Sequence, residues 1–262
     1  MRHFVHLAYN GSRYRGWQRQ PNAPSVQETL EGAFSKMLGE KTTVIGCGRT
    51  DAEVHADRYF AHLDVPAPLS YDPVQRINRI LPDDIAVFDM TKMPARAHAQ
   101  FDAKKRTYVY RLHSVKNPFL RETSTWFALK KLNSIEMKQA VKLMKDYRDF
   151  RAFCKTPDIY PNTICDIFSA EFKINDSKTH AVFRITANRF LRGMIRLCVG
   201  NILLVGQGRM TVAEFENHLK TRVAPKFYTA APPQGLYLTD VEYDYAELEN
   251  CSHKSVFPPL LF

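Results

Sequence analysis

A short segment, Gly48-Arg49-Thr50-Asp51-Ala52, carries the residues of this chain that are best suited to chemistry. It places one carboxylate, Asp51, next to a cation and directly after the apolar run Thr42 to Cys47, which is typical of a β-strand. An Asp at the end of a strand can be exposed and still be held by the fold, and a carboxylate can add to an electrophile and later leave. The segment therefore indicates a nucleophile, although an Asp that stabilises a turn or caps a helix has the same local sequence.

The charge balance indicates what Asp51 faces. The chain of 262 residues has 37 Lys and Arg against 27 Asp and Glu, which gives a formal net charge of +10. Such an excess is typical of proteins that bind nucleic acid or an anionic membrane, and it also serves solubility. Basic and aromatic residues alternate at Arg13-Tyr14-Arg15-Gly16-Trp17 and at Lys104-Lys105-Arg106-Thr107-Tyr108, a pattern that suits phosphate contact combined with base stacking. RNA is therefore the expected partner.

Several other classes of function find no support in the sequence. The five scattered cysteines form no C-x-x-C pair and no zinc-binding spacing, so we expect reduced thiols and no metal site. No apolar stretch approaches the ~20 residues that span a bilayer, and the alternating run Phe4 to Tyr9 begins the chain without a signal peptide. Gly46 and Gly48 do not form a phosphate-binding loop, because no Gly-Lys-Ser/Thr follows them. These observations favour a cytoplasmic protein that does not associate with membranes.

The elements that must position Asp51 follow a simple order. Strands are predicted over residues 3–9, 42–47, 58–65 and 85–90. Ser25 and Glu28 form a capping box at the start of a helix that Gly39 ends, and Asp72-Pro73 begins a second helix. The resulting βαββαβ order predicts a ferredoxin-like unit.

The rest of the chain predicts the same order with additions. Strands are predicted over residues 107–112, 164–174, 180–187 and 236–243, and helices over 134–147, 191–205 and 211–219. We therefore predict an α+β fold of two fused ferredoxin-like βαββαβ halves, residues 1–103 and 104–262, with antiparallel sheets, helices on one face and a catalytic cleft between the halves. The tail, residues 251–262, is expected to lie over the surface.

Five ordered stretches resemble the signature motifs of the TruA family of tRNA pseudouridine synthases. They are Tyr9-Asn10-Gly11 through Gly16-Trp17-Gln18-Arg19-Gln20-Pro21 with Ser25-Val26-Gln27, Gly48-Arg49-Thr50-Asp51-Ala52 with Val54-His55-Ala56, Lys105-Arg106-Thr107-Tyr108-Val109-Tyr110, Phe190-Leu191-Arg192-Gly193-Met194-Ile195-Arg196, and Gly235-Leu236-Tyr237-Leu238. The stretches span nearly the whole chain, which makes the resemblance specific. It implies isomerisation of uridine to pseudouridine at positions 38 to 40 in the anticodon stem-loop of tRNA, a homodimer, and no cofactor or catalytic metal.

The resemblance also implies roles for single residues. Arg196 would pair with the catalytic Asp51, and a partner acid is expected in any case because the surrounding helix is apolar, although another acid would satisfy that need. Tyr108 would stack on the extruded uracil and assist removal of the C5 proton, and Leu236 would line the uracil pocket, whereas ordinary packing accounts for either residue alone. Arg49 would enter the space left by the flipped nucleotide, or else bind a phosphate.

Eight residues are expected to contact RNA. They are Arg13, Arg15, Trp17 and Arg19 in the loop after the first strand, and Lys104, Lys105, Arg189 and Arg192 further along the chain. Any single one of them is equally well explained as a solvated surface residue. Tyr110 is assigned to packing, and His55 is left out of the catalytic set because a lone His after a turn is more often structural.

One position departs from the family pattern. The family usually has Gly where this chain has Glu53, inside the segment that carries Asp51. A Glu there adds negative charge close to the carboxylate and removes a residue that tolerates a positive φ. Activity or substrate range can therefore differ from that of a typical member.

Two other functions fit parts of the sequence. A non-catalytic RNA-binding protein would share the βαββαβ order, but the Lys/Arg-Gly-Phe-like signature of such modules is absent. A glycoside hydrolase needs two opposed carboxylates, and Glu53 is the one candidate near Asp51. Adjacent loop residues rarely lie on opposite sides of one bond, so the isomerase remains the leading hypothesis.

Overall fold

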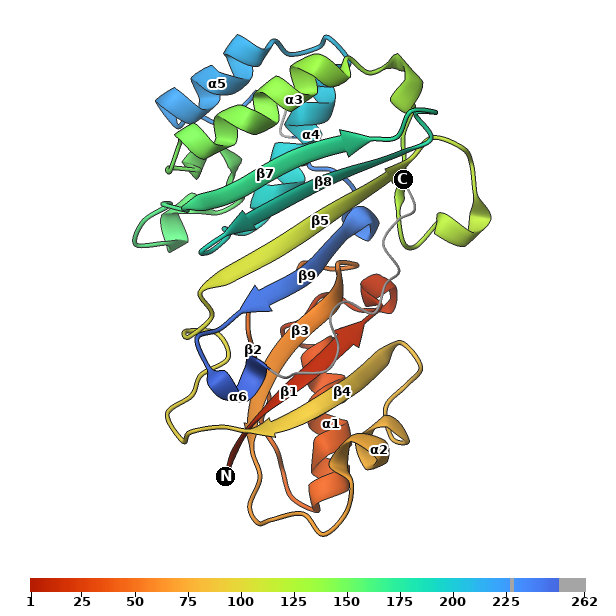
Figure 1. Cartoon of the computed structure of the whole chain (residues 1–262), viewed down its shortest axis with the longest axis vertical. Helices are drawn as coiled ribbons and strands as arrows, with labels where there is room; N and C mark the ends of the chain where they lie inside the picture. Colours follow the sequence, from red (N-terminus) through yellow and green to blue (C-terminus); the bar gives the residue numbers. More distant parts are fainter. Residues whose placement is uncertain (227–228, 250–262) are drawn as a thin grey trace. The chain divides into compact units, whose positions relative to one another are not determined.

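The computed structural model of the chain describes residues 1–226 and 229–249, which form two compact units (Figure 1). Unit 1 contains residues 1–106 and the described residues from Tyr237 onward, and unit 2 contains residues 107–236. The predicted division at 103/104 assigned the last strand to the second half, whereas the contacts group that strand with the first unit. That the chain consists of two ferredoxin-like halves stays a prediction. The expected surface position of residues 251–262 lies outside the described residues.

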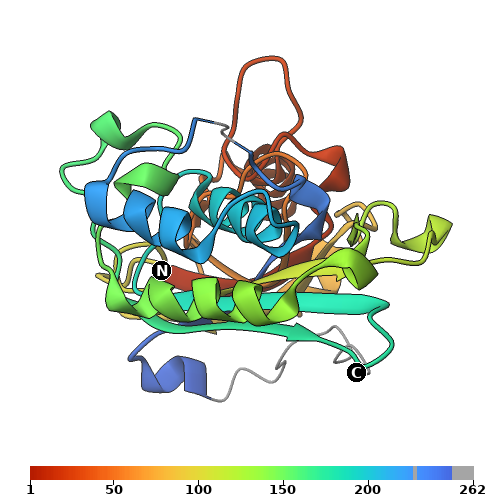
Figure 2. The same cartoon turned by 90° about the horizontal axis from the view of Figure 1, so that it is seen from above.

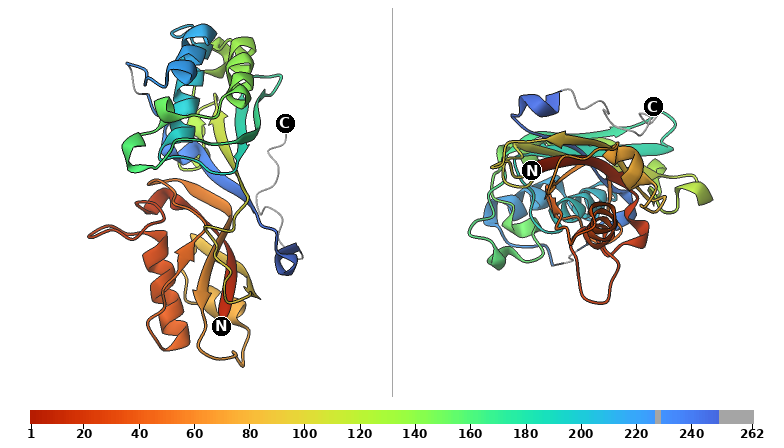
Figure 3. Two further views of the ribbon diagram at one scale, coloured as in Figure 1. Left: turned by 90° about the vertical axis from the view of Figure 1, so that its left-hand side faces the viewer. Right: turned by 90° about the horizontal axis from the view of Figure 1, so that it is seen from below.

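Unit 1 combines antiparallel strands with one parallel pair. Its elements are β1 (Arg2–Tyr9), α1 (Val26–Leu38), β2 (Ile45–Gly46), β3 (His55–Asp64), α2 (Pro73–Asn78), β4 (Ile85–Lys92), nearly all of β9 (Leu236–Glu242) and α6 (Ala246–Glu249). The strand order is β4-β1-β3-β9, and β2 also pairs with β3. Strand β1 runs antiparallel to β3 and β4, and β3 runs parallel to β9. Helix α1 lies alongside these strands on one face, and α2 contacts both α1 and β4 (Figure 3).

The predicted starts of both helices in unit 1 are confirmed. The Ser25 hydroxyl accepts the Glu28 N–H at 3.3 Å, and Gly39, at φ 76°, ends α1 in the left-handed conformation. Asp72 accepts the N–H groups of residues 74 and 75, and Pro73 fills the first helical position. The buried face of α1 consists of Val26, Leu30, Ala33, Phe34 and Met37. These local signals fix the helix that supports the segment around Asp51.

Strands β2 and β3 differ from their predicted extents. A strand was predicted over residues 42–47, but β2 has two residues, because side chains of α1 bind both backbone groups of Val44 in place of a neighbouring strand. Strand β3 begins at His55, three residues before its predicted start. There His55 and Ala56 pair with residues 237 and 238 of β9. Both differences arise from partners distant in sequence.

Unit 2 also combines strands with helices. Its elements are β5 (Lys105–His113, from Thr107 on), β6 (Thr125–Trp126), α3 (Ser134–Leu143), β7 (Ile167–Ile174), β8 (His180–Ala187), α4 (Met194–Gly206) and α5 (Val212–Thr221). The strand order is β5-β8-β7, with β7 and β8 antiparallel and β6 parallel to β5. Helix α3 contacts β7, α4 and α5 (Figure 2). The chain is thus a mixed α/β protein in which parallel and antiparallel pairs both occur.

The helices of unit 2 agree with prediction except at their ends. Helix α3 was predicted to reach residue 147 but ends at Leu143, where a 3₁₀ turn over Met144–Asp146 follows. Helix α4 begins at Met194 and not at residue 191, because Gly193 at φ 71° holds a left-handed conformation that no helix continues through. Thr211 and Glu214 form a reciprocal capping box at α5.

The part of the chain that the structure describes contains no helix long and apolar enough to cross a membrane. Its four cysteines, Cys47, Cys154, Cys165 and Cys198, are buried free thiols. Burial raises the pKa of Cys47 to about 11 and that of Cys165 to about 12. These two thiols are therefore protonated at neutral pH and unsuited to nucleophilic catalysis.

His62 on β3 is a buried histidine whose protonation opposes folding. It is 3% exposed, its Nδ1 accepts the Ala99 N–H at 3.0 Å, and its ring centroid lies 4.6 Å from that of His98. Burial, with the charges of Arg2 and His98, lowers the pKa of His62 to about 4. The folded state therefore binds this proton far less readily than the unfolded chain.

We expect the stability of the protein to fall as the pH drops from 6.5 to about 4, because in that range His62 is protonated in the unfolded chain and neutral in the folded one. The slope from this group is at most ~1.4 kcal/mol per pH unit. Thermal melts of the wild type and of His62→Gln, whose amide oxygen can accept the Ala99 N–H, measure the effect. An equal loss of Tm in both proteins over this range would contradict it.

Candidate active site

Asp51 lies in a short loop, residues 47–54, between β2 and β3; we call it the Asp51 loop. Asp51, Ala52 and Glu53 are half-buried, and Arg49 is exposed. The carbonyl of Asp51 accepts the Val54 N–H at 3.2 Å, so the chain turns tightly immediately after the carboxylate. Asp51 is therefore a turn residue at the surface of unit 1 and not part of its core.

Side chains from three other elements hold the first half of the Asp51 loop. The Tyr59 hydroxyl on β3 donates to the Gly48 carbonyl, and the Tyr9 hydroxyl on β1 lies 2.8 Å from the Thr50 hydroxyl. The Arg106 guanidinium donates to the Cys47 carbonyl from Nη2 at 2.8 Å and from Nε at 3.2 Å. Arg106 belongs to the sequence motif that precedes Tyr108 but was not among the predicted site residues. Its role depends on a contact 59 residues away, which no local pattern reveals.

The loop that is predicted to contact RNA, residues 10–24, is joined to the Asp51 loop through the backbone; we call it the RNA-contact loop. The Trp17 N–H donates to the Thr50 carbonyl at 3.2 Å, and the Glu53 N–H donates to the Tyr14 carbonyl at 3.1 Å. Gly16, at φ 96°, lies so close that a Cβ atom there would clash with the Thr50 carbonyl oxygen. Only glycine permits this approach together with this backbone conformation. The two loops therefore form one structural unit.

Glu53 is held in the backbone conformation for which glycine is best suited. Its φ is 64°, in the left-handed region. A non-glycine residue there carries a cost of order 1 kcal/mol or more. The family's usual glycine at this position would avoid that cost, so the departure seen in the sequence has a structural consequence.

Glu53→Gly is expected to raise Tm by roughly 1–3 °C, since relief of the backbone strain is partly offset by the greater freedom of glycine in the unfolded chain. Differential scanning calorimetry measures the change. Glu53→Ala is the matched control, because it removes the charge and keeps the strain. A rise of equal size in Glu53→Ala would assign the effect to charge and not to the backbone.

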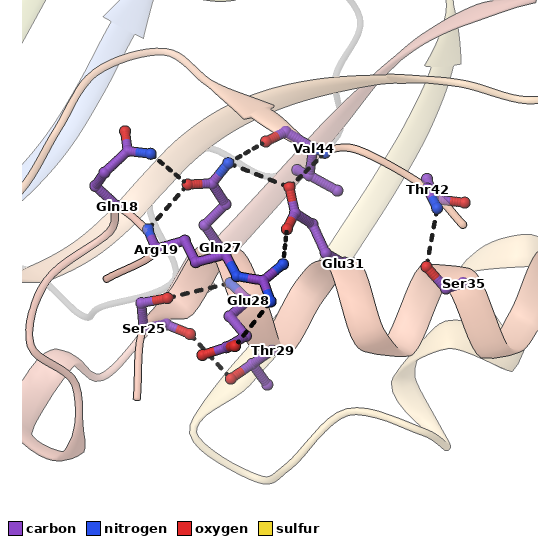
Figure 4. Close-up of polar contacts among 10 residues, drawn as sticks. All are labelled: Gln18, Arg19, Ser25, Gln27, Glu28, Thr29, Glu31, Ser35, Thr42 and Val44. Carbon is purple, nitrogen blue, oxygen red and sulfur yellow. Dashed lines mark hydrogen bonds and ion pairs between the residues drawn. The ribbon is translucent and has the colours of Figure 1, made fainter. Parts of the chain in front are cut away.

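The basic side chains of the RNA-contact loop differ in their surroundings. Arg13 and Arg15 are exposed, and Arg13 lies 3.7 Å from an Asp84 carboxylate oxygen. The Arg19 guanidinium lies 3.4 Å from Glu28 and 3.7 Å from Glu31, both on α1 (Figure 4). The Arg19–Glu28 pair is exposed and so contributes little to stability, which lets a phosphate compete with Glu28 for Arg19.

Trp17 does not have the exposure expected of an RNA contact. It is 2% exposed, its ring stacks on that of Tyr59 with centroids 4.2 Å apart, and it also packs against Gly46. The sequence pattern of Trp among arginines fits both an exposed and a buried ring, since burial depends on Tyr59 forty-two positions later. We assign Trp17 to the support of the Asp51 loop, because its ring stacks on Tyr59, whose hydroxyl binds Gly48.

The other predicted RNA contacts lie on both units. In unit 1, the exposed Lys104 lies 3.3 Å from Asp244, and the half-buried Lys105 lies 2.8 Å from Glu242. In unit 2, Arg189 lies over the ring of Tyr160 at 5.5 Å, and the exposed Arg192 donates its N–H to the Tyr160 hydroxyl at 3.1 Å.

Unit 2 contains Tyr108 and Arg196, the aromatic and the cationic residue that were predicted to act together with Asp51. Tyr108 on β5 is 8% exposed and meets Phe190 edge to face, with ring centroids 5.2 Å apart. Tyr110 is fully buried and its hydroxyl donates to the Pro232 carbonyl at 2.8 Å, which confirms its assignment to packing. Arg196 lies in the first turn of α4.

Arg196 and Leu236 are both fixed by their neighbours in unit 2. The Nε of Arg196 donates to the Ala231 carbonyl at 2.7 Å, and the Ala231 N–H donates to the Arg196 carbonyl at 2.8 Å. The first bond holds the guanidinium at its Nε, and the second joins the backbone of Arg196 to residue 231. Leu236, the first residue of β9, is buried.

His55 shows the features of a structural histidine. It is buried, its ring stacks on that of Tyr237 with centroids 4.5 Å apart, and its Nδ1 accepts the Gly11 N–H at 3.1 Å. An acceptor at Nδ1 requires the neutral ring with its proton on Nε2. Within residues 1–226 and 229–249, no group of three or more His, Cys, Asp or Glu side chains could hold a metal ion.

Comparison with known proteins identifies the family. A family model described as tRNA pseudouridine synthase matches residues 140–244. Proteins named tRNA pseudouridine synthase A are 40% identical in Porphyromonas gingivalis, over 92% of this chain and 97% of the relative, and 42% identical in Bacteroides fragilis, over 92% and 96%. The same name is given to a Bacteroides thetaiotaomicron protein that is 40% identical over 99% of this chain and 97% of its own length. The chain therefore belongs to the family of tRNA pseudouridine synthases, enzymes that isomerise uridine to pseudouridine in tRNA.

Proposed function

We propose that this protein converts uridine to pseudouridine at positions 38 to 40 in the anticodon stem-loop of tRNA, with Asp51 as the nucleophile. The observation that carries the proposal is the Asp51 loop itself. Tyr59 and Arg106 bind its backbone, Tyr9 binds the Thr50 side chain, and the RNA-contact loop is bonded to it directly. A carboxylate on a rigid turn, beside basic residues that can contact RNA, is what a covalent reaction on a nucleotide requires.

The reaction breaks the bond between uracil N1 and the sugar carbon C1′, turns the base, and joins C5 to C1′. The hydrogen on C5 leaves as a proton and N1 gains a proton, so the net change is an isomerisation. The base must leave the helical stack before a side chain can reach it. An adduct of Asp51 with either the uracil ring or the sugar carbon satisfies this balance, because the carboxylate adds and then leaves unchanged.

Four further residues would act on the flipped nucleotide. Arg196 would orient the carboxylate of Asp51 through its Nη groups, its Nε being bound to the Ala231 carbonyl. Tyr108 would stack on the uracil and assist removal of the C5 proton, and its contact with Phe190 supports a fixed ring. Leu236 would line the uracil pocket. Arg49, which is exposed, would enter the space that the nucleotide leaves.

The proposed contacts with tRNA use the basic residues on both units. They are Arg13, Arg15, Arg19, Lys104, Lys105, Arg189 and Arg192. Their charges would bind phosphates and place the anticodon stem-loop in register with Asp51. Trp17 is not among them, because its ring is buried.

The finer statements about fold and assembly are also proposals. Two ferredoxin-like halves are supported by the βαββαβ order and by the strand order β4-β1-β3, with β2 also on β3, in unit 1, and by β5-β8-β7 in unit 2. The family resemblance supports a homodimer, and the buried free thiols support a cytoplasmic location. Light scattering on the purified protein tests the dimer.

Release of tritium from tRNA labelled at uracil C5 tests the activity, because formation of the new C5–C1′ bond expels that hydrogen. The purified protein is expected to release tritium from unmodified tRNA, and the release should disappear when uridines 38 to 40 are replaced by cytidine. Binding of tRNA without any release would favour the non-catalytic RNA-binding protein. Appearance of free uracil would favour a glycoside hydrolase.

A further inference from the structure

Gln27, in the first turn of α1, binds two segments that lie far apart along the chain. We propose that Gln27 is a positioning residue that couples the RNA-contact loop to the strand leading into the Asp51 loop. The inference rests on the proposed function, since it assigns roles to these two segments. Its contacts lie within unit 1, and Figure 4 shows them together.

All four hydrogen-bonding positions of the Gln27 amide are used. Its Oε1 accepts the Gln18 Nε2–H and the Arg19 backbone N–H, each at 3.0 Å. Its Nε2 donates to the Val44 carbonyl at 3.0 Å and to the Glu31 carboxylate at 3.2 Å (Figure 4). The backbone partners fix which end of the amide is oxygen, because an N–H can only donate and a carbonyl can only accept. One side chain thus bridges residues 18–19 and residue 44.

Glu31, one turn further along α1, completes the bridge. The same Oε1 that receives the Gln27 amide accepts the Val44 N–H at 3.2 Å, and Oε2 lies 3.7 Å from the Arg19 guanidinium. The Glu31 side chain is 14% exposed, so solvent screens these contacts only in part. Both backbone groups of Val44 are therefore bound by side chains of α1. The same helix binds the backbone N–H of Arg19 through Gln27 and the Arg19 guanidinium through Glu31.

The bridge reaches the Asp51 loop through a short, tightly packed path. After Val44, Gly46 packs against Trp17 and Tyr59 so closely that a side chain at this position would clash with both. Two residues later the Tyr59 hydroxyl binds the Gly48 carbonyl. The backbone N–H of Gln27 also donates to the Trp17 carbonyl at 3.0 Å. A displacement of the RNA-contact loop at residues 17–19 is thus resisted by the same residue that holds the approach to Asp51.

Hydrogen exchange of the unliganded protein tests the coupling without relying on catalysis. In Gln27→Met, which keeps the side-chain length and removes every amide hydrogen bond, the amides of Arg19 and Val44 should both exchange about tenfold faster or more. Gln139→Glu, an exposed change on α3, is the control and should alter neither amide. Faster exchange at one segment alone, or at neither, would overturn the coupling. Glu31→Gln serves as a milder second variant and should affect the same two segments to a smaller degree.

Kinetics distinguish positioning from a structural role alone. Well below its melting temperature, Gln27→Glu should raise KM for tRNA and lower kcat, each by about tenfold, because its carboxylate faces the Val44 carbonyl and Glu31 without a donor. Lowering the pH should narrow both deficits relative to wild type, since a proton on the introduced carboxyl restores one donor. A merely structural role would lower Tm and leave KM and kcat unchanged, which would overturn the proposal. If the wild type itself lacks activity, the proposed function fails while the exchange result stands.

Discussion

Replacing Asp51 with Asn is expected to abolish pseudouridine formation while tRNA still binds. An amide of the same shape cannot add to the nucleotide and leave again, so the rate should fall on the order of 10⁴-fold or more, as it does when nucleophiles are removed from other enzymes. Binding should persist because the phosphate contacts proposed for tRNA are made by other residues. The loop should stay folded, since the bonds from Tyr9, Tyr59 and Arg106 do not involve the carboxylate.

Single-turnover tritium release measures the chemical step, and filter binding measures affinity for tRNA. Asp176→Asn is the matched control, because Asp176 is an exposed acid in the turn between β7 and β8. That variant should retain full activity and full binding. Full activity in Asp51→Asn would end the nucleophile assignment, whereas lost binding in the same variant would show that the residue acts on recognition.

Replacing Arg196 with Lys is expected to lower kcat by about 10²-fold with a small effect on KM, because a lysine keeps the charge but lacks the planar fork that orients a carboxylate. Lysine also has a single side-chain nitrogen, so it cannot both bind the Ala231 carbonyl, as Nε does, and make the proposed contact with a carboxylate. Arg196→Met should lower kcat further. Initial-rate kinetics over a range of tRNA concentrations separate kcat from KM.

A double-mutant cycle in stability tests whether Arg196 and Asp51 act as a pair. If they do, Arg196→Met should lower Tm more in the wild type than in Asp51→Asn, since the carboxylate that loses its partner is absent from the second background. Arg192→Met, a neighbouring exposed cation, should cost the same in both backgrounds. Additive effects of Arg196→Met and Asp51→Asn would assign Arg196 to some other acid.

The elements that local chemistry determines could be predicted from the sequence. Ser25, Asp72 and Thr211 each cap a helix through bonds to residues two or three positions away, and the pattern is visible in any short window. The strand from His180 to Ala187 matches its predicted bounds, because its alternation is regular and its turn residues are distinctive. Asp51 was expected at the end of a strand, and the turn in which it lies was the alternative interpretation of the same residues.

What could not be predicted depends on partners distant in sequence. Strand β2 is short because Gln27 and Glu31 occupy the backbone of Val44, and no propensity scale registers a side chain 17 positions away. Trp17 is buried because Tyr59 and Gly46 receive it, although its sequence neighbours are basic and polar. The contact of Arg106 could not be predicted either. Arg106 binds a backbone carbonyl, and because every residue has one, the sequence does not show which carbonyl is bound.

The close packing of Gly16 against the Thr50 carbonyl divides the RNA-contact loop into two parts. We call the part next to the Asp51 loop, residues 14–17, its root, and residues 20–23 its tip. Near the root, an insertion between Tyr14 and Trp17 would displace the turn that carries the carboxylate, because both of those residues bond to it. The tip is closed by a backbone bridge between Gln20 and Ala23, so its length does not determine the position of the turn. An insertion within residues 20–23 should therefore leave the turn that carries the Asp51 carboxylate in place, so that the length of this segment can vary independently of the active-site geometry.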